Sequence, residues 1–195
     1  MNKSNIPHGI VILEGPDACG KTTLQDHLVD MYDAIPIHLT YNKDVAPIML
    51  EYQAENMFKA IKMAENNLVI VDRHWISEVI YANVFRGGSP WPYMGELMDL
   101  TWRYYAAIYV LCLPFTIKTS VIRHKENIDQ GHPYSDEKFK ELLLEYLKFY
   151  HSVRYKREDM LQYRIEFEGK NLHLFSQTVL RTLKSQKEKV ETWKL

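Results

Sequence analysis

The stretch "LEGPDACGKTTL", residues 13–24, decides the expected fold because it contains the spacing G-x-x-x-x-G-K-[ST] of a phosphate-binding loop. Its two glycines let backbone N–H groups curl around phosphate oxygens, and the helix that follows directs its positive end at the same group. Lys21 would neutralise the β- and γ-phosphates of a nucleoside triphosphate, and the Thr22 hydroxyl would bind Mg²⁺. The residues expected to hold this cofactor are Gly15, Pro16, Asp17, Ala18, Cys19, Gly20, Lys21, Thr22 and Thr23.

Around this loop, segments with strand and helix patterns alternate along the chain. Short apolar runs predict buried strands, and two weaker runs predict further strands, at 8–15, 67–72, 106–114, 34–41 and 163–169. Pro36 favours a sheet edge for one of the weaker strands. Helical spacing of apolar residues predicts one helix before residue 106 and others at 21–32, 44–66, 75–85, 135–150 and 171–187. This alternation implies a parallel sheet covered on both faces, so we expect one α/β domain over residues 1–195.

Composition and charge exclude several classes of protein. Hydrophobic residues make up 46% of the chain and charged residues 25%, which is typical of a globular protein rather than a disordered or fibrous one. The net charge of −1 gives no overall positive field for nucleic acid, although a local basic groove stays open. The sequence has no apolar run as long as a membrane span, and its N-terminus lacks a signal-peptide core. With Cys19 and Cys112 expected as reduced thiols, these features predict a cytoplasmic protein without a membrane partner.

The segment "VIVDRHWISEVIYA", residues 69–82, gives information about the acceptor side of the site. Asp72 ends a buried strand, and a parallel sheet presents ligand-facing residues at the carboxyl ends of its strands. A carboxylate there holds Mg²⁺ or orients a nucleophile, and the guanidinium of Arg73 suits bidentate binding of phosphate. A purely structural Asp–Arg pair at the strand end is the alternative. We therefore predict Thr22 and Asp72 as metal ligands. Lys21 and Asp72, together with Arg73, are predicted catalytic residues.

Both stretches resemble thymidylate kinases, in which the loop commonly reads EGPDGAGKTT and a later segment reads Asp-Arg-Tyr-x-x-Ser-x-x-Ala-Tyr-Gln. "EGPDACGKTT" matches the loop closely, and "DRHWISEVIYA" matches the later segment at Asp72, Arg73, Ser77 and Tyr81. The resemblance implies a P-loop kinase of three layers, α/β/α, with five parallel strands in its sheet and with ATP and Mg²⁺ as cofactors. It also implies an acceptor pocket beside Asp17 and Arg73, a contact from Asp17 to the acceptor sugar, and a homodimer.

The resemblance also implies a lid, which we expect at about residues 123–135, within "TSVIRHKENIDQGHPYSDE". Basic residues at this position of the fold close over the phosphoryl group during transfer. Arg123 is therefore a fourth predicted catalytic residue, because its charge opposes that of the migrating phosphoryl group. His124 and Lys125 are further candidates, and for all three a solvated surface position is the alternative.

The resemblance to thymidylate kinases thins at the positions that recognise thymine and its 5′-phosphate. Their Arg-Glu-Pro-Gly stretch is replaced by "HLTYNKD", residues 38–44, the Gln after the matched Tyr is Ala82, and the second loop glycine is Ala18. "DRHWISEVIYANVFRGGS", residues 72–89, is closer to P-loop kinases encoded by bacteriophages. Some of these act on ordinary deoxynucleotides, and others phosphorylate the hydroxymethyl group of 5-hydroxymethyluracil within DNA. In the second case, Asp72 is a natural general base for the acceptor hydroxyl.

Three functions therefore stay open. The leading one is a kinase that moves the γ-phosphate of ATP to a pyrimidine deoxynucleoside monophosphate, and the second is a kinase for 5-hydroxymethyluracil in phage DNA. The third is a nucleotide-sensing module without catalysis. His38 and His74 are the histidines near the predicted site, and no zinc site is indicated. The predicted substrate-binding residues are Asp17, Arg73, His74, Trp75, Ser77, Tyr81 and Arg86, with Lys43, Trp91 and Tyr93 as further candidates.

Overall fold

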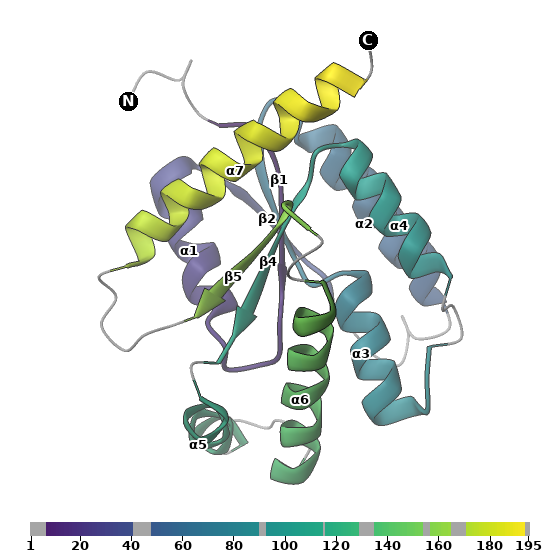
Figure 1. Ribbon diagram of the computed structural model, residues 1–195, viewed down its shortest axis with the longest axis vertical. Coiled ribbons are helices and arrows are strands. Elements are labelled where there is room, and N and C mark those ends of the chain that lie inside the picture. Colours follow the sequence, from purple (N-terminus) through teal and green to yellow (C-terminus); the bar gives the residue numbers. More distant parts are fainter. Residues whose placement is uncertain are drawn as a thin grey trace.

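Five parallel strands form the centre of the computed structural model, which describes residues 7–40, 48–89, 93–114, 116–128, 135–153, 157–164 and 171–193. The strands are β1 (Gly9–Glu14), β2 (Ile35–His38), β3 (Leu68–Asp72), β4 (Ile108–Leu113) and β5 (Met160–Arg164). Their order across the sheet is β2-β3-β1-β4-β5, so β1 is the central strand (Figure 1). The predicted parallel sheet of five strands is confirmed.

Helices cover both faces of this sheet. On one face, α1 (Lys21–Tyr32) and α7 (Leu172–Trp193) contact each other and the strands beneath them. The opposite face is covered by α2 (Met49–Met63), α3 (Trp75–Arg86), α4 (Met94–Tyr104) and α6 (Asp136–Val153), as Figure 1 shows. Beyond the carboxyl ends of β4 and β5, α5 (Ile117–Ile128) packs against α6. The structure thus has the three layers, α/β/α, that the resemblance implied.

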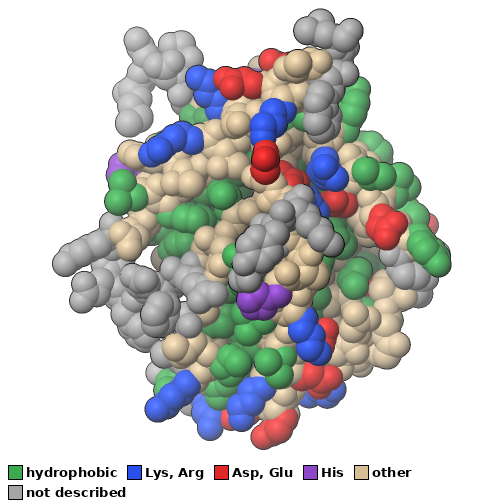
Figure 2. Space-filling model, in the orientation of Figure 1, with side chains coloured by type: hydrophobic (Ala, Val, Ile, Leu, Met, Phe, Trp, Pro, Cys, Tyr) green, Lys and Arg blue, Asp and Glu red, His purple; other side chains and the backbone are tan. Residues whose placement is uncertain are grey.

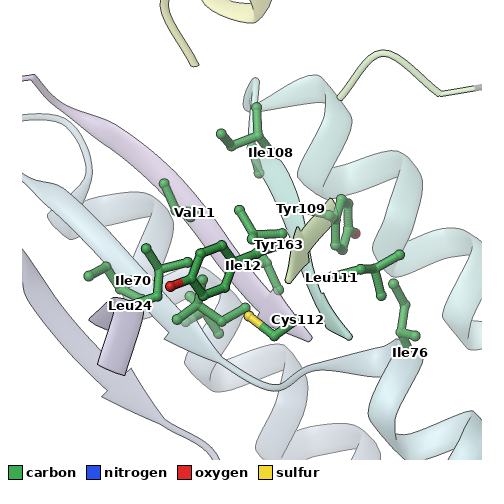
Figure 3. Close-up of a cluster of buried hydrophobic side chains, with 14 of the residues drawn as sticks. Val11, Ile12, Leu24, Ile70, Ile76, Ile108, Tyr109, Leu111, Cys112 and Tyr163 are labelled. Carbon is green, nitrogen blue, oxygen red and sulfur yellow. The ribbon is translucent and has the colours of Figure 1, made fainter. Parts of the chain in front are cut away.

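The hydrophobic core lies on both sides of the three inner strands. Each residue of β1, β3 and β4 is buried, because helices cover these strands on both faces. Figure 3 shows Leu111 of β4 pointing toward Ile76 of α3, and Ile70 of β3 pointing toward Leu24 of α1. Each such side chain stabilises the fold by roughly 1.5–3 kcal/mol relative to an exposed position. The strand ends that carry the candidate site are therefore held on a rigid scaffold.

Most element boundaries follow the sequence pattern, and β5 is the clearest exception. The predicted helix 21–32 is α1, and Pro36 lies in β2 at the edge of the sheet. The last strand was predicted at 163–169, but β5 begins at Met160. Met160 is buried and pairs with Tyr109 of β4, so tertiary pairing starts the strand before the predicted start at Tyr163.

Some predicted features fall outside the described residues. These are Lys43 in the segment 41–47, Trp91 in the segment 90–92, and the part of the predicted lid in the segment 129–134. Tyr93 is described and lies exposed at the start of α4. In the part of the chain that the structure does describe, none of the helices is both long and apolar enough to span a membrane.

The carboxyl ends of β2, β3 and β1 meet at one edge of the sheet. The strand register pairs His38 with Asp72, and Asp72 in turn with Leu13, the residue before Glu14. The loop of residues 15–20 starts at the same edge and leads into α1. The fold therefore brings the predicted phosphate-binding loop next to Asp72 and Arg73.

Candidate active site

The phosphate-binding loop has a backbone that only particular residues allow. Gly15 has a φ of 140°, and a Cβ at this position would lie 2.1 Å from the carbonyl oxygen of Cys112. Gly20 has a φ of 82° and is the N-cap of α1. Ala18 is also left-handed, with a φ of 56°, a conformation that costs a residue with a Cβ roughly 1–2 kcal/mol. The loop thus has a strained backbone that leads directly into the first turn of α1. Thr22 and Thr23 are exposed in this turn, where backbone N–H groups can bind an anion.

Lys21 lies inside this loop. Its side chain is buried, and Nζ donates hydrogen bonds to the carbonyl oxygens of Gly15 at 3.0 Å and Pro16 at 2.7 Å. Burial lowers the pKa of Lys21, and the positive charge of Arg73 lowers it further, while Asp17 and Asp72 act in the opposite direction. The two carbonyl oxygens accept from two of the three donors of the ammonium group but supply no negative charge. A bound triphosphate would supply that charge at this position.

Asp17, Arg73 and Tyr81 form a second group beside the loop. Arg73 forms an ion pair with Asp17, and its Nη1 donates to the Gly15 carbonyl oxygen at 2.9 Å. The Tyr81 hydroxyl donates to the other oxygen of Asp17 at 3.3 Å, and its ring centroid lies 5.2 Å from the Arg73 guanidinium carbon. Sequence positions 17, 73 and 81, which the resemblance assigns to one pocket, are in contact in the structure.

The backbone of Arg73 is held in an uncommon conformation. Its φ is 71°, and its N–H donates to the carbonyl oxygen of Leu13 at 2.9 Å, which continues the pairing of β3 with β1. The next residue is tied down as well, because the His74 N–H donates to Glu14 at 2.9 Å. These two hydrogen bonds direct the Arg73 side chain toward the loop, at a local cost of roughly 1–3 kcal/mol.

Glu14 is a buried carboxyl that the sequence interpretation missed. It accepts hydrogen bonds from the His74 N–H and from the Ser77 hydroxyl, and Ser77 in turn accepts one from the Tyr146 hydroxyl at 2.7 Å. Burial raises the pKa of Glu14 to about 7, against the lowering effect of these hydrogen bonds. Ser77, a predicted substrate-binding residue, thus links β1, α3 and α6 through its hydroxyl. A charged residue at the end of the apolar run before Gly15 was the available signal.

Asp72 and His38 form a pair at the ends of β3 and β2. The distance from His38 Nδ1 to Asp72 Oδ2 is 2.7 Å, and the second carboxylate oxygen, Oδ1, is buried with no hydrogen-bond partner among the described residues. This carboxylate oxygen and the hydroxyl of the exposed Thr22 are oxygen ligands of the kind that Mg²⁺ prefers. The described residues contain no group of three or more His, Cys, Asp or Glu side chains that could hold a metal ion. Mg²⁺ needs no such cage, because it keeps waters and binds substrate phosphates.

Three other predicted substrate-binding residues, His74, Trp75 and Arg86, have hydrogen-bond or ion-pair partners within the protein. His74 is buried, accepts from the Trp102 ring N–H at 3.1 Å and lies 3.2 Å from the Gln53 carbonyl oxygen, and burial lowers its pKa to about 4. Trp75 donates to the Tyr109 hydroxyl at 2.9 Å. Arg86 forms an ion pair with Glu78 at 2.8 Å. These contacts turn the three side chains to the protein interior or along α3.

The helix that carries the predicted lid residue touches the loop. Arg123 lies within α5, and its side chain is outside the described part of the structure. The buried Cys19 Sγ of the loop lies 3.8 Å from the Ser120 hydroxyl of α5, and burial raises the Cys19 pKa to about 11. His124 is buried and stacks on Phe139 of α6, with ring centroids 4.0 Å apart. The first part of the lid segment is thus a packed helix anchored to both the loop and α6.

Comparison with solved structures identifies the fold. The chain is similar to the YorR protein of Bacillus subtilis in complex with phosphorylated GDP, with a TM-score of 0.66, 17% identity, and 92% of this chain and 98% of that chain covered. For deoxyadenosine kinase of M. mycoides with bound dATP, the TM-score is 0.58 and the identity 16%, with 87% of this chain and 98% of that chain covered. For thymidylate kinase of Ehrlichia chaffeensis, the TM-score is 0.53 and the identity 15%, with 90% of this chain and 99% of that chain covered. No protein-family model matches the sequence, and no curated protein matches it significantly. The fold is that of the P-loop nucleotide and nucleoside kinases.

Proposed function

We propose that this protein is a Mg²⁺- and ATP-dependent kinase that transfers the γ-phosphate of ATP to a deoxynucleoside-based acceptor. The observation that carries the proposal is the Lys21 ammonium, which is buried inside the loop and within electrostatic reach of Arg73 and Asp72. A lysine at this place in a P-loop neutralises the β- and γ-phosphates. The shared fold with deoxyadenosine and thymidylate kinases supports the same function.

Phosphoryl transfer depends on positioning and on charge, and the site offers both. Loop N–H groups and Lys21 would hold the triphosphate, and Thr22 with Asp72 would hold Mg²⁺. When bound, the metal ion neutralises charge that develops on the phosphates. Arg73, together with Arg123 from α5, would stabilise the phosphoryl group in transfer. Asp17 and Tyr81 would contact the acceptor next to Arg73.

Two acceptors fit the sequence, and one contact distinguishes them. A pyrimidine deoxynucleoside monophosphate requires a cation for its own phosphate, and Arg73, which this proposal already uses for the phosphoryl group in transfer, is also paired with Asp17. A hydroxyl acceptor, such as the hydroxymethyl group of 5-hydroxymethyluracil in DNA, requires a hydrogen-bonding group near the attacking oxygen. The pair of His38 and Asp72 offers such a group, so this contact favours the hydroxyl acceptor.

Transfer of label from [γ-³²P]ATP tests the proposed function. The purified protein is incubated with labelled ATP, Mg²⁺ and each of three acceptors: deoxythymidine, its 5′-monophosphate, and a duplex that contains 5-hydroxymethyluracil. Label on one of these acceptors supports a kinase. Tight ATP binding with no transfer to any of these acceptors, and none to a wider set of nucleosides, would favour the sensing module instead.

We also propose that a second copy of the chain packs on the outer face of α4. Leu97 and Leu100 are exposed there by 55% and 60%, and Figure 2 shows hydrophobic side chains gathered along this edge of the molecule. An antiparallel packing of two α4 helices about a two-fold axis beside Leu100 would place the exposed Glu96 of one copy opposite the exposed Arg103 of the other.

Light scattering after size exclusion tests this interface. We expect about twice the monomer mass of 23.1 kDa for the wild type, and the monomer mass for the double variant Leu97→Lys and Leu100→Lys. Leu144→Lys, at an exposed position of α6, is the matched control and should stay dimeric. A monomeric wild type at micromolar concentration would refute the dimer.

A further inference from the structure

We propose that His38, oriented by Asp72, is the residue that makes the site select a hydroxyl group rather than a phosphate as the acceptor. The inference rests on the proposed kinase function and specifies its acceptor class. The acceptor would be a primary hydroxyl, carried either by the sugar of a deoxynucleoside or by a hydroxymethylated pyrimidine base in DNA. His38 was noted only as a nearby histidine in the sequence, and its role follows from its contacts.

The pair is built on adjacent strand ends. His38 is the last residue of β2 and Asp72 the last residue of β3, and the two are direct partners in the strand register. Their side chains meet at 2.7 Å, from Nδ1 to Oδ2. The Leu39 N–H donates to the Asp72 carbonyl oxygen at 3.1 Å, which holds the backbone just after β2. The backbone on either side of the pair is therefore held, and Asp72 orients the imidazole ring.

The two side chains of the pair differ in exposure, with Asp72 on the buried side and His38 on the exposed side. The Asp72 side chain is 9% exposed, whereas that of His38 is 55% exposed. The carboxylate can only accept a hydrogen bond, so Nδ1 of His38 carries the hydrogen. In the neutral ring the other nitrogen, Nε2, is then a hydrogen-bond acceptor on the exposed side. Asp72 thus sets which tautomer the ring presents at the edge of the site.

A hydroxyl matches this arrangement and a phosphate does not. A hydroxyl donates its hydrogen to Nε2, which directs an oxygen lone pair away from His38 and toward the triphosphate. A phosphate monoester at neutral pH is an anion that has mainly acceptor oxygens, so the neutral ring offers it an acceptor nitrogen with the Asp72 carboxylate behind it. Arg73, the cation next to Asp72 in the sequence, is paired with Asp17.

The reaction balances with groups already named. The acceptor oxygen forms a bond to the γ-phosphorus of ATP, and the bond from that phosphorus to the β,γ-bridging oxygen breaks. The electron pair of the broken bond leaves with ADP, and the hydroxyl hydrogen is released to water as a proton. His38 acts by holding the hydroxyl in line before the bond forms, a contribution for which a displacement of about 1 Å costs on the order of 100-fold in rate.

Two substitutions at His38 separate contact with the acceptor from support of Asp72. His38→Asn places its amide nitrogen near the position of Nδ1, so it still donates to Asp72 but has lost Nε2. His38→Gln reaches the position of Nε2 with an acceptor oxygen. His151→Ala, at an exposed position on α6, is the matched control. Each protein is assayed for transfer to deoxythymidine, to its 5′-monophosphate, and to a duplex that contains 5-hydroxymethyluracil.

We expect the wild type to label one of the two hydroxyl acceptors and not the monophosphate. His38→Asn should lower kcat for that acceptor by about 100-fold, with KM for ATP and the melting temperature close to those of the control. His38→Gln should recover part of the lost rate. A wild type that labels only the monophosphate would overturn the inference and leave the kinase function standing. Full activity of His38→Asn would also overturn it, because His38 would then only support Asp72. Absence of transfer by the wild type would instead refute the proposed function.

Discussion

The substitution Glu14→Gln is expected to change how the stability of the protein depends on pH. The Glu14 carboxyl is buried and accepts hydrogen bonds from the His74 N–H and the Ser77 hydroxyl. A glutamine can make the same contacts, because its Oε1 accepts from His74 while its Nε2 donates to Ser77. The Ser77 hydroxyl then donates to the Tyr146 oxygen, 2.7 Å away. The substitution therefore removes the ionisable group and keeps the hydrogen bonds among position 14, His74, Ser77 and Tyr146, with the Ser77–Tyr146 bond reversed in direction.

The size of the effect follows from the pKa. Burial raises the pKa of Glu14 from 4.5 to about 7 in the folded protein. A carboxyl with a raised pKa contributes stability that is full below its unfolded pKa and is lost as the pH rises through its folded pKa. The loss falls between about pH 4.5 and about pH 7, and it amounts to about 3 kcal/mol in the free energy of unfolding. Gln does not titrate, so the difference between the two proteins isolates this one group.

Urea denaturation at about pH 5 and about pH 8, followed by tryptophan fluorescence, measures that difference. We expect the wild type and Glu14→Gln to agree within about 1 kcal/mol at the lower pH, and the variant to be more stable by about 2–3 kcal/mol at the higher pH. Glu145→Gln, at a half-buried position of α6 where Glu145 pairs with the exposed Lys148, is the control and should show no such change. A difference that is the same at both pH values would refute the assignment of Glu14 as a buried titrating carboxyl.

Gly15→Ala should abolish ATP binding in calorimetry and lower the free energy of unfolding by at least about 3 kcal/mol, because its Cβ would lie 2.1 Å from a carbonyl oxygen of β4; normal affinity would contradict the loop geometry. Burial raises the pKa of both Cys19 and Cys112, so neither thiol should react with a disulfide reagent in the native protein, and both should react in urea. Arg86→Ala should keep the transfer rate within about twofold, because Arg86 pairs with Glu78; a tenfold loss would place Arg86 in contact with substrate.

The layers and strand ends of this fold were predictable because they depend on local pattern. The apolar runs of β1, β3 and β4 are buried on both faces, and such runs stand out in any sequence. The loop was predictable for the same reason, since its glycines, Lys21 and Thr22 are contiguous. The bounds of β5 were not, because its start is set by pairing with Tyr109, a partner from a distant part of the chain.

Within the candidate site, the sequence indicated residue types but not their partners. Ser77 was interpreted as a substrate contact because its spacing matched a motif, yet its hydroxyl bonds to Glu14 and Tyr146, from two other elements. His74 is a predicted substrate-binding residue, and in the structure its ring contacts Trp102 from α4. The contacts of Ser77 and His74 depend on how α4 and α6 pack against α3, and a single sequence does not specify that packing. His38 gained a role for the same reason, since β2 and β3 pair only in the folded sheet.

The central claim is that Lys21 in the loop supports transfer of the γ-phosphate of ATP. The most direct measurement is the rate of label transfer from [γ-³²P]ATP to the preferred acceptor by wild type, Lys21→Ala and Lys184→Ala, the last being an exposed lysine of α7. The account predicts transfer by the wild type and by Lys184→Ala, and a loss of at least about 100-fold in Lys21→Ala. Transfer by Lys21→Ala at the wild-type rate would contradict it.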